Sequence, residues 1–267
     1  MFGLRAIGYM LLAVTLALTL SSCVHLPGGP TGSLLPLAQE VRARLEARQQ
    51  AVSSLVLSGE VELVAPQGTL NGDHLIMGLA PDRIRAEVLG PFGQPLLRVV
   101  TDGRRMAVLS YRENRAYVGQ ASRANLSRFL GLALSPGEIF ALLAGCPPLL
   151  PQPAKADVLP SDAGGGQKLL RLVEPGGQVS EGVVFDPLDY AVERAWLESR
   201  GNGPNLEMSF GRFSAALGSR YPGRLKAVDS QGRSLLLISQ EVKLNTKVDP
   251  ALFEVTVPPG LEVVELP

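Results

Sequence analysis

Side chains that could carry out covalent or metal chemistry are few in this chain, and they are scattered. The 267 residues include two cysteines, Cys23 and Cys146, and two histidines, His25 and His74. A Ser–His–Asp site would have to use His74, but no Gly-x-Ser-x-Gly motif stands near it. No cluster has the spacing of zinc ligands, and the glycine-rich stretches lack the Lys-Ser/Thr ending of a phosphate-binding loop. The pattern predicts a protein that is not an enzyme and uses no metal or cofactor, with His74 and Asp73 forming a polar pair near a turn.

Cys23 is the chemistry-bearing residue whose neighbours follow an ordered pattern. A start with one positive charge, at Arg5, precedes an apolar run over residues 6–20. This run is shorter than the ~20 residues of a membrane-spanning helix and has the length of a signal-peptide core. In Leu20-Ser21-Ser22-Cys23, small side chains would let the backbone enter a peptidase cleft, and the thiol could take a diacylglyceryl group.

This order resembles the lipobox of bacterial lipoproteins, which implies a signal peptide over residues 1–22 and lipid attachment, palmitate included, at Cys23. The alternative is an ordinary secretory signal followed by a chance cysteine. Two or three acyl chains would anchor the protein stably, at ~0.8 kcal/mol per buried CH₂. In enteric bacteria an Asp after the cysteine resembles an inner-membrane retention signal. Val24 stands there instead, so we expect the bacterial outer membrane, facing the periplasm.

The charge balance bears on which partners the protein can bind, and the second cysteine bears on disulfide formation. Removing residues 1–22 takes away only Arg5, so the 25 basic residues become 24, against 25 acidic ones. This near-neutral balance argues against nucleic acid as a partner, because phosphate binding needs a concentrated basic field. Acylation of Cys23 would leave Cys146 without a partner, and we expect it to be a small buried apolar residue.

The mature chain divides into a tether and a folded body. Residues 23–36 are rich in glycine and proline, which predicts a lipidated flexible tether. Residues 37–267 are expected to form one folded domain. It begins with a helix over residues 37–52, because Leu37, Val41, Leu45 and Val52 fall near one helical face.

From Ser54 the hydrophobic period changes from helical to two, which predicts strands. Turn signals such as Asn71-Gly72 and Asp229-Ser230-Gln231-Gly232 separate the runs. Residues 122–145 interrupt the strands with helical spacing, and Ser135, Pro136 and Glu138 form the start of a helix with a capping box. The predicted fold class is mainly β: an antiparallel half-open β-barrel of about eleven strands. It has an N-terminal helix and a helical lid inserted between the sheet halves.

Such a barrel is either filled by its own side chains or hollow. A plain packed core is the reading that the sequence alone favours. A cavity for acyl chains would instead need aliphatic walls with few hydrogen-bonding groups. The candidate wall residues are Leu57, Val61, Ile84, Val88, Leu126, Phe129, Leu142, Leu235 and Leu237.

An apolar turn tip gives a second functional candidate. The turn Gly90-Pro91-Phe92-Gly93 carries Phe92 where turns usually carry polar residues. Its neighbours force a tight bend that would push the ring outward, and an exposed loop aromatic suits membrane insertion or a partner pocket. We therefore take Phe92 as a candidate membrane-contact residue. The alternative is a ring folded back over the sheet edge.

Taken together, these residues resemble the LolB-like outer-membrane lipoproteins of the lipoprotein-carrier superfamily. The likeness rests on the lipobox, the tether and helix, the Gly90–Gly93 hairpin, Asn125–Gly131, Leu142–Pro147, Val248–Phe253 and Pro258–Gly260. It implies an open β-barrel with a helical lid and an apolar cavity that binds acyl chains. Family members accept acylated lipoprotein cargo from a periplasmic carrier and place it in the outer membrane. The resemblance also puts Phe92 at the family's protruding loop position, where leucine is expected.

A rival interpretation keeps the fold and changes the ligand. The chain would then be a non-enzymatic envelope lipoprotein that binds another lipid, a polymer or a protein partner. Co-purification of a specific partner, without lipoprotein cargo, would favour this rival.

Overall fold

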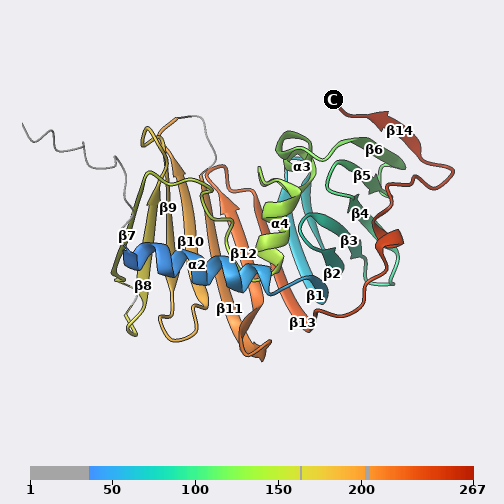
Figure 1. Cartoon of the computed structure of the whole chain (residues 1–267). Helices are drawn as coiled ribbons and strands as arrows, with labels where there is room; N and C mark the ends of the chain where they lie inside the picture. Colours follow the sequence, from blue (N-terminus) through green and yellow to red (C-terminus); the bar gives the residue numbers. More distant parts are fainter. Residues whose placement is uncertain (1–35, 163, 202–204) are drawn as a thin grey trace, which may run out of the picture. The chain divides into compact units, whose positions relative to one another are not determined.

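One open sheet of fourteen strands organises the chain (Figure 1). The computed structural model describes residues 36–162, 164–201 and 205–267, so the predicted signal peptide, Cys23 and nearly all of the predicted tether lie outside the described residues. The first half of the sheet consists of β1 (Ser54–Ala65), β2 (Gly68–Leu79), β3 (Arg83–Leu89), β4 (Pro95–Thr101), β5 (Arg105–Ser110) and β6 (Arg115–Gln120). The second half consists of β7 (Lys155–Pro160), β8 (Lys168–Val173), β9 (Val179–Phe185), β10 (Val192–Ser199), β11 (Leu206–Ala216), β12 (Ser219–Asp229) and β13 (Ser234–Leu244).

Each half is an antiparallel meander of chain neighbours, and the two halves meet where β1 pairs with β13. A last strand, β14 (Glu262–Glu265), adds to β6 in the parallel direction. The order is therefore β14-β6-β5-β4-β3-β2-β1-β13-β12-β11-β10-β9-β8-β7. This confirms the predicted mainly-β class with a helical insert between two sheet halves, although there are fourteen strands rather than about eleven.

The prediction of a turn at Asn71-Gly72 is wrong. Both residues lie within β2, where they pair with Glu62 and Val61 of β1. The turn that joins these strands comes earlier, between Ala65 and Gly68, so the hairpin is already closed. Gly72 is needed for another reason: a Cβ there would collide with the backbone carbonyl of Leu89 on β3.

Three helices pack on one face of the sheet. They are α2 (Pro36–Gln50), α3 (Arg123–Leu130) and α4 (Pro136–Leu143). The predicted capping box at the start of α4 is confirmed, because Ser135 and Glu138 bond each other's backbone N–H groups. α2 lies across the second half of the sheet, with Val41 and Leu45 in the same core as residues of α4 and β13 (Figure 1). Leu37 was predicted to lie on the buried face of this helix, but it is exposed, and Ala38 is buried instead. Among the described helices, none is long and apolar enough to cross a membrane.

The C-terminal segment covers the opposite face of the first half. After a short 3-10 helix, η1 (Pro250–Phe253), it packs Val255, Val257 and Leu261 against the buried residues of β4, β5 and β6. Phe253 is fully buried. Strands β4–β6 are thus covered on both faces, because α3 packs on the other side.

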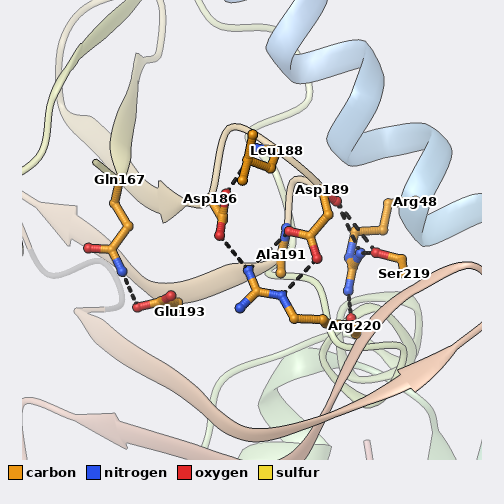
Figure 2. Close-up of polar contacts among 9 residues, drawn as sticks. All are labelled: Arg48, Gln167, Asp186, Leu188, Asp189, Ala191, Glu193, Ser219 and Arg220. Atoms are coloured by element: carbon orange, nitrogen blue, oxygen red, sulfur yellow. Dashed lines mark hydrogen bonds and ion pairs between the residues drawn. The ribbon is translucent and has the colours of Figure 1, made fainter. Parts of the chain in front are cut away.

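A polar cluster ties α2 to the far end of the second half (Figure 2). Arg48 of α2 donates to the Ser219 hydroxyl and the Arg220 carbonyl at the start of β12. Arg220 in turn pairs at 2.7 Å with both Asp186 and Asp189, in the turn between β9 and β10. The hydrogen bond from Arg220 lowers the pKa of Asp189. These contacts fix one end of α2 above the sheet.

Candidate functional site

An apolar cavity of about 70 Å³ lies between the sheet and the two helices α3 and α4, which we call the lid. α3 contributes Leu126 and Leu130, and α4 contributes Ile139 and Leu143. The remaining wall comes from β1–β4 and β13, and consists of Val61, Leu63, His74, Ile76, Ile84, Ala86, Glu87, Val88, Leu97, Val99, Thr101, Leu235 and Leu237. The wall is therefore mostly aliphatic, and the lid closes one side of it.

The structure brings six of the nine predicted wall residues together around this cavity: Val61, Ile84, Val88, Leu126, Leu235 and Leu237. Leu57 and Leu142 are buried in the core around it. Phe129 packs instead on Tyr117, with ring centroids 4.8 Å apart, and lines an adjacent pocket that shares Leu63 and Leu97 with the cavity. Sequence spacing groups residues by face, but it does not tell which of them border a hollow.

The cavity is closed in this structure by direct contacts of the lid. Arg123 of α3 and Glu138 of α4 form an ion pair at 2.5 Å. The Tyr221 hydroxyl of β12 donates to the Leu143 carbonyl at the end of α4. Asn125 of α3 is buried, and its amide donates to the carbonyl of Pro267 at 2.7 Å. These bonds hold both lid helices to the sheet and to the C-terminal segment.

The apolar cavity between the sheet and the lid is small for a lipid-binding site. The cavity's 70 Å³ is less than half of the ~150 Å³ apolar cavity that admits benzene. An acyl chain therefore needs more room than the cavity offers in this structure. The lid is held by buried side chains such as Leu126, Phe140 and Leu142, whereas the strands below it share backbone hydrogen bonds.

His74 is a polar exception in the aliphatic wall. The residue lies on β2 with 3% of its surface exposed, and among the described residues neither ring nitrogen has a hydrogen-bond partner. Burial lowers the pKa of the imidazole, and the nearby Glu60 backbone and Asp73 carboxylate offset this in part. The ring is therefore neutral at neutral pH, with one N–H donor and one acceptor.

The predicted polar pair of His74 and Asp73 near a turn is wrong. β2 runs through both positions, and successive side chains of a strand point to opposite faces. Asp73 is accordingly exposed while His74 is buried. The signal that could have placed His74 was its position in the alternation, two residues before Ile76.

Phe92 lies at the tip of the turn between β3 and β4 with 93% of its surface exposed. The Gly93 N–H donates to the Gly90 carbonyl at 2.9 Å, and the Phe92 N–H donates to the Gln94 side chain at 3.0 Å. Gly93 takes a φ of 74°, a left-handed conformation that favours glycine. The tight turn thus holds the ring out in solvent.

A second exposed apolar tip escaped the sequence analysis, which treated residues 186–189 only as a hairpin connection. Leu188 is 91% exposed between β9 and β10, and its N–H donates to Asp186 beside the Arg220 cluster (Figure 2). The strand registers place this turn at the opposite end of the sheet from Phe92. The two apolar tips therefore lie at opposite strand ends of the sheet.

Cys146 is the cysteine among the described residues. Cys146 is buried, as predicted, and burial raises the pKa of its thiol to about 11, which disfavours the reactive thiolate. Among residues 36–162, 164–201 and 205–267, no three His, Cys, Asp or Glu side chains gather as metal ligands.

Comparison with known proteins identifies the fold. No protein-family model matches the sequence, and no curated protein matches it. A domain assigned as an outer membrane lipoprotein-sorting protein from Vibrio parahaemolyticus aligns with a TM-score of 0.54 at 13% identity, over 81% of this chain and 97% of that one. A LolA-superfamily protein from Nitrosomonas europaea gives 0.54 at 14% identity, over 80% and 97%. A DUF1329-family protein from Desulfovibrio piger gives 0.55 at 12% identity, over 82% and 96%.

These likenesses confirm the fold implied by the resemblance to the lipoprotein-carrier superfamily: the chain has a LolA-like fold. At 12–14% identity they show the fold alone. The roles of individual residues must be argued from this chain.

Proposed function

We propose that this chain, which has a LolA-like fold around a lid-covered apolar cavity, is a bacterial envelope lipoprotein that binds acyl chains. In this role residues 1–22 are a signal peptide, lipid on Cys23 anchors the chain in the outer membrane, residues 23–36 are a tether, and residues 37–267 face the periplasm. The body receives acylated lipoproteins and helps to insert them. The observation that carries the proposal is the cavity wall, which is mostly aliphatic and covered by two short helices.

The transfer requires no covalent chemistry. Acyl chains would pass from one apolar environment to another, driven by the burial of apolar surface, with the bilayer as the deepest sink. The Vibrio parahaemolyticus domain assigned to lipoprotein sorting has the same fold, which supports a ligand of this class. A periplasmic carrier that hands over the cargo is the partner that this role requires.

In the proposed function, the lid opens before an acyl chain binds. In this structure α4 packs against β3 and α3 packs against β1, and part of this contact would be exchanged for contact with the acyl chain. Little apolar surface is then exposed to water at any stage, so the exchange costs little. Phe92, at the sheet end away from Leu188, would contact the membrane when cargo is released.

A second candidate is a lipoprotein of the same fold that binds another lipid, a polymer or a protein. The closed cavity of about 70 Å³ favours it, because a filled body needs no acyl ligand. Both candidates share the anchor and the non-enzymatic role, and they differ in whether the cavity opens.

The test uses the processed full-length protein in nanodiscs and a fluorescent dipalmitoylglyceryl-cysteine peptide. We expect saturable binding of this probe, followed by its delivery to added vesicles. Phe92→Glu should leave binding unchanged and slow delivery about 30-fold, because a buried aromatic ring gains ~2 kcal/mol at a membrane and a carboxylate gains nothing.

Leu188→Glu is the matched control, since Leu188 is equally exposed on a turn at the other end of the sheet. Its delivery rate should match that of the wild type. Absence of saturable binding would reject acyl-chain binding in favour of the second candidate. Equal slowing by both variants would remove the specific role of Phe92.

A further inference from the structure

His74 is a buried polar side chain without a well-formed hydrogen bond among the described residues, although the Glu60 backbone lies near enough to raise the pKa of the ring. It is more than nine-tenths buried, and the side chains of Val61, Ile76 and Val88, which line the same wall, can neither donate nor accept a hydrogen bond. Among the described residues, no group meets hydrogen-bond geometry with either ring nitrogen. Buried polar side chains are normally paired, since an unpaired one loses its hydration without compensation. A leucine at this position would fill similar space without that cost.

The chemistry of the wall limits what could pair with the ring. The imidazole is neutral at neutral pH and offers one N–H. No lysine or arginine belongs to the described wall, and its one carboxylate, Glu87, already pairs with Arg85 and Arg98. An anionic head group would therefore enter this cavity without a counter-charge, which is costly. An uncharged oxygen acceptor suits the site better.

We infer that the His74 N–H donates a hydrogen bond to the ester carbonyl of an acyl chain bound in the cavity. This inference rests on the proposed function and deepens it: the site would recognise a chain with its carbonyl linkage, not only a hydrocarbon. The aliphatic wall binds the chain, and His74 fixes how far the chain enters. The ligand class is thus an esterified acyl group rather than a free fatty acid.

The experiment compares two probes that differ only in this carbonyl. One is the fluorescent dipalmitoylglyceryl-cysteine peptide, and the other is its dihexadecyl ether analogue, which lacks the ester carbonyls. Binding of both is measured with the processed full-length protein in nanodiscs, as the wild type and as His74→Leu and His74→Gln. The leucine removes the donor, whereas the glutamine restores an N–H at similar reach.

We expect His74→Leu to weaken binding of the ester probe about 5- to 10-fold and to change binding of the ether probe less than about twofold. His74→Gln should recover most of the ester affinity. An equal loss for both probes would show that His74 only packs against the chain, and would overturn this inference while leaving the proposed function intact. Failure of the wild type to bind either probe would overturn both.

Discussion

Two buried ionisable side chains, His74 and Glu181, show how the same physical cause acts in opposite directions. Burial disfavours charge, so it lowers the pKa of the His74 imidazole and raises the pKa of the Glu181 carboxyl to about 8. Glu181 lies on β9, where one carboxyl oxygen accepts the Leu150 N–H at 2.7 Å. Both groups are therefore uncharged in the folded protein at neutral pH, but only His74 borders the cavity.

Glu181 makes the stability of the fold depend on pH. Its folded pKa is raised above the usual 4.5, so its contribution is fully present below that value and is lost as the pH rises toward about 8. We expect the free energy of unfolding to fall by about 2–4 kcal/mol more between pH 5 and pH 8.5 in the wild type than in Glu181→Gln. Urea unfolding, followed by the fluorescence of the single tryptophan, Trp196 on neighbouring β10, measures this difference.

The glutamine variant isolates Glu181 from the other titrating groups. His74 has the opposite effect on stability, because its lowered pKa makes the folded state less stable as the pH falls. This effect is the same in the wild type and in Glu181→Gln. Parallel stability curves for the wild type and Glu181→Gln would show that the carboxyl is not held protonated by burial.

At the scale of elements, the decisive junction is the pairing of β1 with β13, because it joins the two halves of the sheet. Its register shifts by one residue between Ser58 and Gly59. A Cβ at Gly59 would collide with the backbone carbonyl of Ile238, and a backbone atom cannot turn aside as a flexible side chain can. The junction therefore requires glycine at this position.

Gly59→Ala should lower the free energy of unfolding by about 2–4 kcal/mol, because the clash forces the two central strands apart. Gly211→Ala on β11 is the matched control: nothing lies within 4 Å of a Cβ there, so its stability should change by less than about 0.5 kcal/mol. Urea unfolding of both variants in detergent measures the difference. If the two substitutions cost the same, the close approach at Gly59 is not a constraint.

The elements that the sequence predicts well are those whose signal is local. The alternation of apolar and polar residues predicted most of the strands. The start of α4 was predicted at the correct residue from Ser135, Pro136 and Glu138. β14 was missed because a four-residue strand is defined by its partner, β6, which lies far away in the sequence. The predicted wall residues share a face, but only three-dimensional packing separates Leu57 and Phe129 from the residues that border the cavity. His74 and Asp73 were predicted to pair near a turn because Asn71-Gly72 is a common turn sequence, but those two residues lie inside β2.

At the scale of the whole molecule, the proposed role depends on where the chain is held. The sequence carries equal numbers of basic and acidic residues, so no general electrostatic attraction to a membrane is expected. Attachment would come from lipid on Cys23, and location from the residue that follows it. Neither residue belongs to the described part of the chain, so both assignments stay predictions.

Cys23→Ala should abolish incorporation of an alkyne analogue of palmitate in cells and release the protein from the membrane fraction. Cys146→Ala, which removes the other cysteine, should keep both properties. Val24→Asp should move the labelled protein from the outer to the inner membrane in an enteric host, as density-gradient fractions would report. Undiminished labelling of Cys23→Ala would refute the lipid anchor.

The junction between β1 and β13 also sets the order in which the molecule can be assembled. The hairpins of each half form between chain neighbours and can fold as soon as both of their strands are available, but β1 must wait for a partner near the other end of the chain. During that wait its edge is unpaired and open to aggregation. Leu235 and Leu237 of β13 belong to the cavity wall, so the cavity is complete only after this slow, long-range step. A half-folded chain thus has no complete cavity, and the proposed binding of acyl chains would begin only when the whole sheet has formed.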